Sequence, residues 1–435
     1  MTTEKTAVRK TVLFDWHLAN HATMAEFGGY QMPLWYPSGA KHEHRTVLTG
    51  VGLFDTSHMG VLTVAGEAAW SLLQHCFSRD LRTCIGIKPG PLTPGRCVYG
   101  LFLRENGTVL DDAIISQLGP ERYLVVVNSG MGPIVREHLL LHANGPVDVA
   151  DRSGRIGKID VQGPAAALVL EGLLGDPDKV LSDMIYFSCK GDVEEGPTAV
   201  LLRDKTPILL SRTGYTGEFG FEIYLPAAAT VSVWEQLLAA GRNREIAACG
   251  LASRDSLRTG AVLPLSHQDI GDWLFQNTPW SFVLPWDETG QRFSKSFIGA
   301  EGLSAARDKS YTYPFAGYDP RKIPVTDKTV VLDRHEVAIG TVLTCTTDMG
   351  IDRVGEQIVS IVSPESAGRP ADFLARGLSC GFVKTNRPCV AGEQVRLTDG
   401  KRSVPVEIRR DIRPDRTARR SMREMRNQEM RGETR

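Results

Sequence analysis

The fourteen residues Ser211–Tyr224 constrain the fold of this chain more than any other segment. Glycines recur there at every third position, at Gly214, Gly217 and Gly220. Such spacing indicates a turn whose backbone needs positive φ or a close approach to neighbouring atoms. From Gly220 onward, apolar residues alternate with other residues, so the pattern predicts that a half-buried β-strand follows the turn.

The predicted strand carries a carboxylate. Its two faces separate Phe221, Ile223 and Leu225 from Glu222 and Tyr224. A buried carboxylate needs a partner, because an unpaired charge is costly in an apolar interior. On an ordinary antiparallel sheet, however, the polar face contacts solvent. The residues alone therefore leave open whether Glu222 belongs to a site or to the surface.

Length and composition indicate an ordinary globular protein. The chain has 435 residues, 42% of them hydrophobic, and a formal net charge of −1, which is typical of two or three domains with a sizeable core. A net charge near zero argues against nucleic acid as the main partner. The first residues lack the apolar segment of a secretory signal, and no run of about 18 apolar residues offers a membrane span. We therefore expect a cytoplasmic protein.

Neither the cysteines nor the histidines predict a metal site. The eight cysteines are scattered without a Cys-x-x-Cys pair, so reduced thiols are expected rather than a disulfide framework. His42 and His44 are two residues apart and do not share a helix face, and His58 lies further along the chain. We expect these histidines to be hydrogen-bonded polar residues rather than ligands.

A predicted hairpin carries two adjacent aspartates. It comprises an alternating strand over residues 95–103, the turn Glu105–Gly107 and a returning strand over residues 109–115. Asp111 and Asp112 follow each other in the returning strand, so their side chains should point to opposite faces. The inward carboxylate has two interpretations: it accepts hydrogen bonds from backbone amides or an arginine, or it serves in chemistry.

Several blocks of the sequence resemble, in order, motifs of the glycine-cleavage T-protein (aminomethyltransferase) family. The blocks are Val51–Gly60, Val161–Pro164, Arg212–Ile223 and Gly250–Arg258, and the resemblance covers roughly residues 11–410. It implies an α+β fold in which two interleaved α/β folate-binding domains and a small C-terminal β-barrel form a three-domain clover-leaf.

The family fold implies approximate domain boundaries. Domain 1 combines residues 1–55 and 150–245, domain 2 combines residues 56–149 and 246–300, and the barrel domain comprises residues 301–412. Short strands spaced by turn residues support the barrel; they are Thr329–Leu332, Glu336–Leu343, Leu378–Val383 and Gln394–Leu397. The tail, residues 413–435, holds eight arginines and four acids. We expect it to lie beyond the fold as a solvated helix, or to dock an acidic partner.

The resemblance implies a tetrahydrofolate-dependent aminomethyltransferase, which transfers a one-carbon unit from the aminomethyl-lipoyl arm of H-protein to tetrahydrofolate and releases ammonia. Asp111 matches the catalytic aspartate of the family, and a buried carboxylate beside the acceptor nitrogens suits acid–base work. The positions that match the folate pocket are Met59, Tyr99, Tyr123, Val127, Asn128, Tyr215, Glu222 and Arg254. A carboxylate such as Glu222 can accept the two adjacent N–H groups of a pterin.

Two segments depart from the family pattern. Where the family has Leu-Glu-Ala-x-x-x-Leu-Tyr-Gly, this chain has Thr-Gly-Ala-Val-Leu-Pro-Leu-Ser-His over Thr259–His267, so the glutamate and the tyrosine are missing. Thr344–Gly350 replaces the family turn Thr-Ser-Gly-x-x-Ser-Pro. The departures, notably Gly260 and Ser266, keep open an alternative: a tetrahydrofolate-dependent demethylase that acts on an N-, O- or S-methylated small metabolite.

A second alternative is a non-catalytic folate-binding module, such as the T-protein-like iron–sulfur assembly factors. Those proteins carry a Lys-Gly-Cys-Tyr-x-Gly-Gln motif, whereas this chain has Ser-Cys-Lys-Gly-Asp over Ser188–Asp192. The presence of Asp111 favours an enzyme. The partner is therefore expected to be lipoylated H-protein or a small methylated donor.

Overall fold

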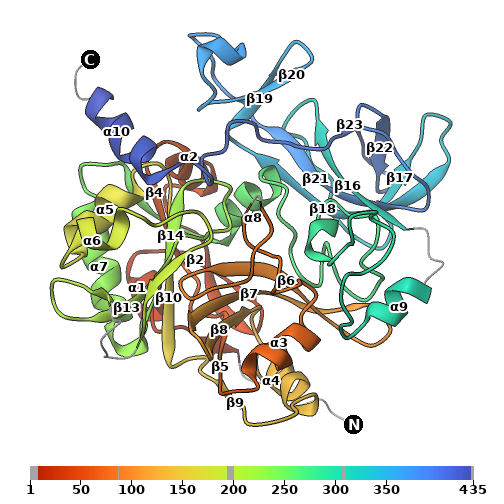
Figure 1. Ribbon diagram of the computed structural model, residues 1–435. Helices are drawn as coiled ribbons and strands as arrows, with labels where there is room; N and C mark the ends of the chain where they lie inside the picture. Colours follow the sequence, from red (N-terminus) through yellow and green to blue (C-terminus); the bar gives the residue numbers. More distant parts are fainter. Residues whose placement is uncertain (1–7, 87, 194–199, 306–309, 433–435) are drawn as a thin grey trace.

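Two β-sheets made from interleaved segments of the chain, together with a closed β-barrel, organise the fold of the computed structural model (Figure 1). The structure describes residues 8–86, 88–193, 200–305 and 310–432. Helices cover the two sheets, and the barrel lies beside them. The architecture is α+β, as the sequence predicts.

The first sheet gathers strands from distant parts of the chain. Its strands are β4 (Val51–Asp55), β10 (Ile156–Gln162), β11 (Cys189–Gly191), β12 (Val200–Leu201), β13 (Pro207–Ser211), β14 (Gly220–Pro226) and β15 (Ile246–Cys249). Their order is β11-β13-β14-β10-β4-β15, with β12 paired to β13. Helices α5 (Ala166–Leu173), α6 (Pro177–Leu181) and α7 (Thr230–Ala240) accompany this sheet. Phe221, Ile223 and Leu225 point into its hydrophobic core, which confirms the predicted alternation in β14.

The second sheet contains the predicted hairpin. Its strands are β5 (Gly60–Ala65), β6 (Cys97–Leu103), β7 (Val109–Gly119), β8 (Arg122–Val127) and β9 (Asp148–Asp151), and its helices are α3 (Ala69–Cys76) and α4 (Gly132–Leu141). The order is β6-β7-β8-β5-β9. Strands β6 and β7 pair antiparallel, with Phe102 opposite Asp111 and Leu101 opposite Asp112.

The two sheets interleave along the chain, and two of their strands cross the expected domain boundaries. Strand β9 belongs to the second sheet although it straddles residue 150. Strand β15 pairs parallel with β4 in the first sheet, whereas the sequence boundary assigned it to domain 2. Helix α8 (Leu251–Gly260) follows β15 and packs on α2 (Ala40–Thr49). Residues 246–260 therefore lie with the first sheet.

The C-terminal strands close into a barrel. They are β16 (Tyr311–Gly317), β17 (Val330–Leu332), β18 (Ala338–Asp348), β21 (Leu378–Thr385), β22 (Gln394–Thr398) and β23 (Ser403–Ile408). The closed order is β16-β21-β18-β17-β22-β23. The four strands predicted from sequence all occur here, and β18 extends five residues beyond the predicted end at Leu343, to Asp348.

The arginine-rich tail is not outside the fold, which corrects the expectation from sequence. Arg413 is fully buried, and Met422 and Met425 of α10 (Met422–Gly432) lie in the core of the first sheet. Figure 1 shows the tail crossing from the barrel back to this sheet. The many arginines of the tail indicate a solvated segment, but Met422, Met425 and the guanidinium of Arg413 are buried and pack it against the fold.

Shorter elements complete the fold. They are β1 (Arg9–Lys10), α1 (Phe14–Ala19), β2 (Thr23–Phe27), β3 (Tyr30–Trp35), η2 (Ser281–Val283), α9 (Ala300–Ala305), β19 (Ile351–Val354), β20 (Gln357–Ser360), and the 3-10 turns η1 (Ala227–Ala229) and η3 (Glu365–Ala367). Within the described ranges, no helix is both long enough and apolar enough to cross a membrane.

Candidate functional site

The two sheets face each other across a shared apolar cluster. Val126 of β8 and Tyr224 of β14 belong to this cluster, and Met59 packs against it. The polar face of β14, which carries Glu222, and the face of β7 that carries Asp112 both border the same region, because side chains alternate along each strand. This region between the sheets is the candidate site.

Glu222 lies at the first-sheet side of the site and is buried, with 5% of its surface exposed. Its Oε1 accepts a hydrogen bond from Lys158 Nζ at 2.5 Å. Its Oε2 accepts hydrogen bonds from Thr213 Oγ1 at 2.5 Å and from Tyr224 Oη at 3.2 Å. The surface interpretation of Glu222 is therefore wrong, and the partner that a buried carboxylate requires is a lysine on the neighbouring strand.

Lys158 also connects Glu222 to a second carboxylate. Its Nζ lies 2.6 Å from Asp160 Oδ1, and Asp160 Oδ2 accepts a hydrogen bond from Arg254 Nη1 at 2.7 Å. Burial raises the pKa of Asp160, but Lys158 and Arg254 outweigh that effect and lower it to about 2. Two cations and two carboxylates thus form a charge-balanced cluster, which is how buried charges are accommodated.

The glycine-spaced turn shapes the wall beside this cluster. A Cβ on Gly214 or Gly220 would lie 2.0 Å and 2.6 Å from side-chain atoms of Gln162, and Gly217 has φ of +77°. Gln162 Nε2 donates to the carbonyl oxygen of Phe221 at 3.0 Å. Gly214 and Gly220 therefore allow the close approach that the spacing predicts, and Gly217 adopts the predicted positive φ.

Tyr215 connects the two halves of the site. Its hydroxyl donates to the carbonyl oxygen of Pro264, and the guanidinium of Arg254 lies 5.0 Å from its ring centroid. Burial raises the pKa of Tyr215 and the Asp112 carboxylate raises it further, whereas Arg258 and Arg254 lower it. Charges from strand β7 and from helix α8 therefore act on one phenol.

Asp111 is fully buried and accepts several hydrogen bonds. Asn128 donates from its backbone nitrogen at 2.9 Å and from Nδ2 at 2.8 Å. Ser266 Oγ donates at 2.9 Å, and His267 Nε2 lies 3.6 Å from the carboxylate. These donors fix the orientation of the Asp111 carboxylate.

Asp112 is only partly buried and has fewer partners. It accepts hydrogen bonds from Tyr99 Oη at 2.8 Å and from Asn128 Nδ2 at 2.6 Å. Burial and the adjacent negative charge of Asp111 raise its pKa to about 6. The two aspartates therefore differ: Asp111 is fully buried and held by several donors, whereas Asp112 can exchange a proton near neutral pH.

Most of the expected site residues lie close together, and six of them have partly buried side chains. Partly buried side chains border the region between the sheets: Met59, Tyr99, Asp112, Asn128, Tyr215 and Arg254. Tyr123 and Val127 do not join them, because both side chains lie in the core on the other face of the second sheet. The Tyr123 hydroxyl donates to the carbonyl oxygen of Pro120 at 3.1 Å. Alternation along β8 turns Leu124 and Val126 toward the site instead.

Sequence reasoning missed Lys158, Asp160 and His267. The first two alternate with Ile159 and Val161 in β10, a buried strand with two charges on one face. That period-2 pattern was a usable signal, because two opposite charges on one buried face indicate an internal ion cluster. His267 had no comparable local signal, because a loop carries it to Asp111.

The histidines considered as ligands have other surroundings. His44 Nε2 lies 2.9 Å from Asp348 Oδ1, and burial lowers the pKa of His58 to about 4. Among the residues that the structure describes, no group of three or more potential ligands is arranged to hold a metal ion.

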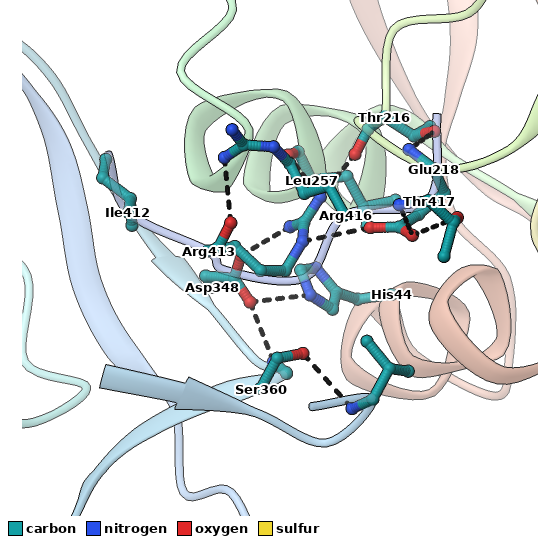
Figure 2. A network of polar contacts seen from close by, with 12 residues as sticks. His44, Thr216, Glu218, Leu257, Asp348, Ser360, Ile412, Arg413, Arg416 and Thr417 are labelled. Carbon is teal, nitrogen blue, oxygen red and sulfur yellow. Dashed lines mark hydrogen bonds and ion pairs between the residues drawn. The ribbon is translucent and has the colours of Figure 1, made fainter. Parts of the chain in front are cut away.

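The two segments that depart from the family pattern meet in a second buried cluster (Figure 2). A Cβ on Gly260 would lie 1.8 Å from Asp348 Oδ2, so the small residue makes room for that carboxylate. Asp348 pairs with Arg413 Nη1 at 2.6 Å, and Arg413 Nε lies 3.3 Å from Glu218 Oε1. The tail thus connects the barrel to the glycine-spaced turn.

The loop between α8 and residue 270 connects this second cluster to the aspartate pair. Asp269 accepts hydrogen bonds from Arg258 and, at 2.6 Å, from Thr344 Oγ1 of β18. Gln268 Nε2 also donates to Thr344 Oγ1, at 2.6 Å. Ser266 and His267 of the same loop reach Asp111. The loop is therefore held between the barrel and the second sheet.

Residues 13–282 match a family model described as the GCVT N-terminal domain. The chain belongs to the GCVT family. It is 36% identical over 341 residues to an aminomethyltransferase of Symbiobacterium thermophilum, covering 77% of this chain and 83% of that protein. It is also 38% identical over 265 residues to an aminomethyltransferase of Geobacillus kaustophilus, covering 61% of this chain and 67% of that protein.

A solved structure has the same fold. The glycine cleavage system aminomethyltransferase T of Bartonella henselae aligns with a TM-score of 0.72 and 24% sequence identity, covering 92% of this chain and 97% of that one. The likeness extends through the barrel, beyond the residues that the family model matches. The three-domain fold of the GCVT family is therefore confirmed for this chain.

Proposed function

We propose that this protein is a tetrahydrofolate-dependent aminomethyltransferase of the glycine-cleavage T-protein type. It transfers a one-carbon unit from the aminomethyl-lipoyl arm of H-protein to tetrahydrofolate and releases ammonia. Family membership and relatives named aminomethyltransferases support the class of reaction. The observation that carries the proposal is the position of Tyr215: its ring lies 5.0 Å from the Arg254 guanidinium, and its hydroxyl donates to the carbonyl oxygen of Pro264, in the loop that reaches Asp111.

The residues on the first-sheet side fit a pterin. Glu222 presents two carboxylate oxygens, and Lys158, Thr213 and Tyr224 hold them in place. Such a carboxylate suits the adjacent amino and ring N–H groups of a pterin. The half-buried thioether of Met59 offers a soft surface for a flat heterocycle. We assign binding of the folate ring to these residues, together with Tyr215.

The residues on the second-sheet side fit proton transfer. Two nitrogens of tetrahydrofolate each lose a proton when they bind the one-carbon unit. One proton is gained by the lipoyl sulfur of H-protein, which leaves as a thiol, and one by the amino group, which leaves as ammonia. Asp112 can take up and return a proton near pH 7, because its pKa lies at about 6. We assign the acid–base work to the pair Asp111 and Asp112, and Asn128 orients both by donating hydrogen bonds to each carboxylate. The side chain of Tyr99 orients Asp112.

Product analysis tests this proposal against the two alternatives. Purified protein is mixed with tetrahydrofolate and either aminomethyl-loaded H-protein or a panel of N-, O- and S-methyl donors. Methylene-tetrahydrofolate and ammonia from H-protein support the proposal. Methyltetrahydrofolate from a small donor would make the protein a demethylase. Folate binding without transfer from any donor would indicate a non-catalytic module.

A further inference from the structure

His267 contacts the aspartate pair although its loop departs from the family motif. Its Nε2 lies 3.6 Å from Asp111 Oδ1, and 45% of its side chain is exposed. Its neighbour Ser266 donates to the same oxygen at 2.9 Å. One short segment therefore brings a hydroxyl and an imidazole to the Asp111 carboxylate.

The backbone holds His267 in this position. Its φ is +62°, in the left-handed region that residues other than glycine seldom adopt. Residues on both sides fix the loop: Ser266 forms a β-bridge with Ile270, and Asp269 accepts a hydrogen bond from the backbone nitrogen of Leu265 at 2.9 Å. A strained position that its surroundings maintain is a recurrent feature of functional sites.

The charges around His267 favour its cationic form. The Asp111 carboxylate is the largest effect and raises the pKa of His267, and Asp112 raises it further, whereas partial burial and Arg104 of the neighbouring hairpin turn lower it. Arg104 is itself paired with Asp272 at 2.9 Å. The imidazole of His267 thus lies directly beside the Asp111 carboxylate.

We propose that His267 is a positioning residue for the acid–base pair: its imidazolium holds the negative charge on Asp111 and so leaves the exchangeable proton to Asp112. This role rests on the proposed function for its chemistry, but the charge coupling does not depend on any substrate. Two adjacent carboxylates share protons as a pair. A cation beside only one of them makes that one the anion, and the assignment of roles then follows from geometry. The family motif has Leu-Tyr-Gly where this chain has Leu-Ser-His over residues 265–267.

Two measurements test the role of His267. Proton NMR follows the titration of His267 in the wild-type protein and in D111N, and H267Q identifies its resonance. The midpoint is expected above that of an ordinary histidine in the wild-type protein and to fall in D111N. The second measurement is the pH profile of transfer. In H267Q the acid limb is expected to move to higher pH by about half a unit, because loss of a nearby positive charge favours the protonated carboxyl.

The control is H335Q, which changes an exposed histidine of the barrel and should leave the profile unchanged. H267G separates charge from backbone strain, because it relaxes φ and should show the same shift of the acid limb. An ordinary midpoint for His267 that is equal in D111N would overturn the inference. So would an acid limb that stays in place in H267Q. Absence of transfer by the wild-type protein would instead overturn the proposed function, and the NMR titration would still decide the coupling.

Discussion

The guanidinium of Arg413 lies 2.6 Å from the carboxylate of Asp348, and both side chains are fully buried. Arg413 begins the C-terminal tail, and Asp348 ends barrel strand β18. Glu218 and the carbonyl oxygens of Thr216 and Leu257 complete the surroundings of the guanidinium. The pair therefore joins the tail and the barrel to the turn beside the candidate site.

Replacing Arg413 by methionine should strongly destabilise the protein. The substitution leaves Asp348 and Glu218 buried without their cation, and breaking a buried pair from one side costs about 3–5 kcal/mol. Urea unfolding at pH 7 measures the loss. R410M is the matched control, because Arg410 is exposed, and it should change the free energy of unfolding by less than about 0.5 kcal/mol. Equal stabilities of the two variants would contradict the buried role of Arg413.

Replacing Gly260 by alanine should create a clash with Asp348. The new Cβ would lie 1.8 Å from Asp348 Oδ2, and forcing atoms into a packed interior costs about 1–3 kcal/mol. G119A serves as the control, because a Cβ there meets nothing nearer than 3.8 Å. Thermal or urea unfolding of both variants provides the comparison. A G260A protein as stable as G119A would show that the carboxylate does not occupy this space.

Removing the Lys158 cation should weaken both the cluster and folate binding. In K158M, Glu222 loses the ammonium that donates to its Oε1, so its carboxylate is less well oriented and should accept pterin N–H groups less well. Equilibrium binding of tetrahydrofolate should weaken at least tenfold at pH 7. K328M, which changes an exposed lysine, should bind normally. Unchanged affinity in K158M would remove Glu222 from the proposed pterin site.

The same cluster should leave a signature in the pH dependence of stability. The pKa of Asp160 is lowered to about 2 in the folded protein, against about 3.9 in an unfolded chain. The contribution of Asp160 to the free energy of unfolding is therefore present above pH 4 and is lost as the pH falls through 2. A pKa shift of this size corresponds to about 2–3 kcal/mol. Urea unfolding between pH 5 and 2 should show a shallower decline in K158M than in the wild-type protein. Parallel declines would contradict this assignment.

Asp112 should matter for activity and not for stability. Its pKa of about 6 reflects burial beside the charged Asp111, so the carboxylate weakens the folded state at pH 7. D112N should therefore unfold at the same or a higher urea concentration while transfer slows by about 100-fold or more. D148N, at an exposed position of the same sheet, should change neither property. Destabilisation of D112N without loss of transfer would reverse the interpretation.

Local patterns predicted the strands and the glycine turn because they depend on alternation and on backbone conformation. Phe221 and Glu222 fall on the expected faces of β14. The same alternation excludes Tyr123 and Val127, whose positions were inferred from family motifs rather than from the faces of β8. A motif match gives a residue's place in the chain, but its side chain points where the sheet directs it.

Long-range contacts were not predictable from one sequence. Nothing near Arg413 indicates that its partners are 65 and 195 residues away. His267 reaches Asp111 across 156 residues, through a loop held by the barrel. Such pairs depend on the packing of three domains, which local propensity does not encode.

Single-turnover transfer from aminomethyl-loaded H-protein to tetrahydrofolate tests the proposed function most directly. Rapid quenching would follow methylene-tetrahydrofolate and ammonia in the wild-type protein, D111N and D112N. We expect the two products in equal amounts from the wild-type protein, with a rate that rises with pH through about 6 and that falls by about 100-fold or more in D112N. Bound tetrahydrofolate that remains unmodified would contradict the proposal. So would products that D111N and D112N form as fast as the wild-type protein does.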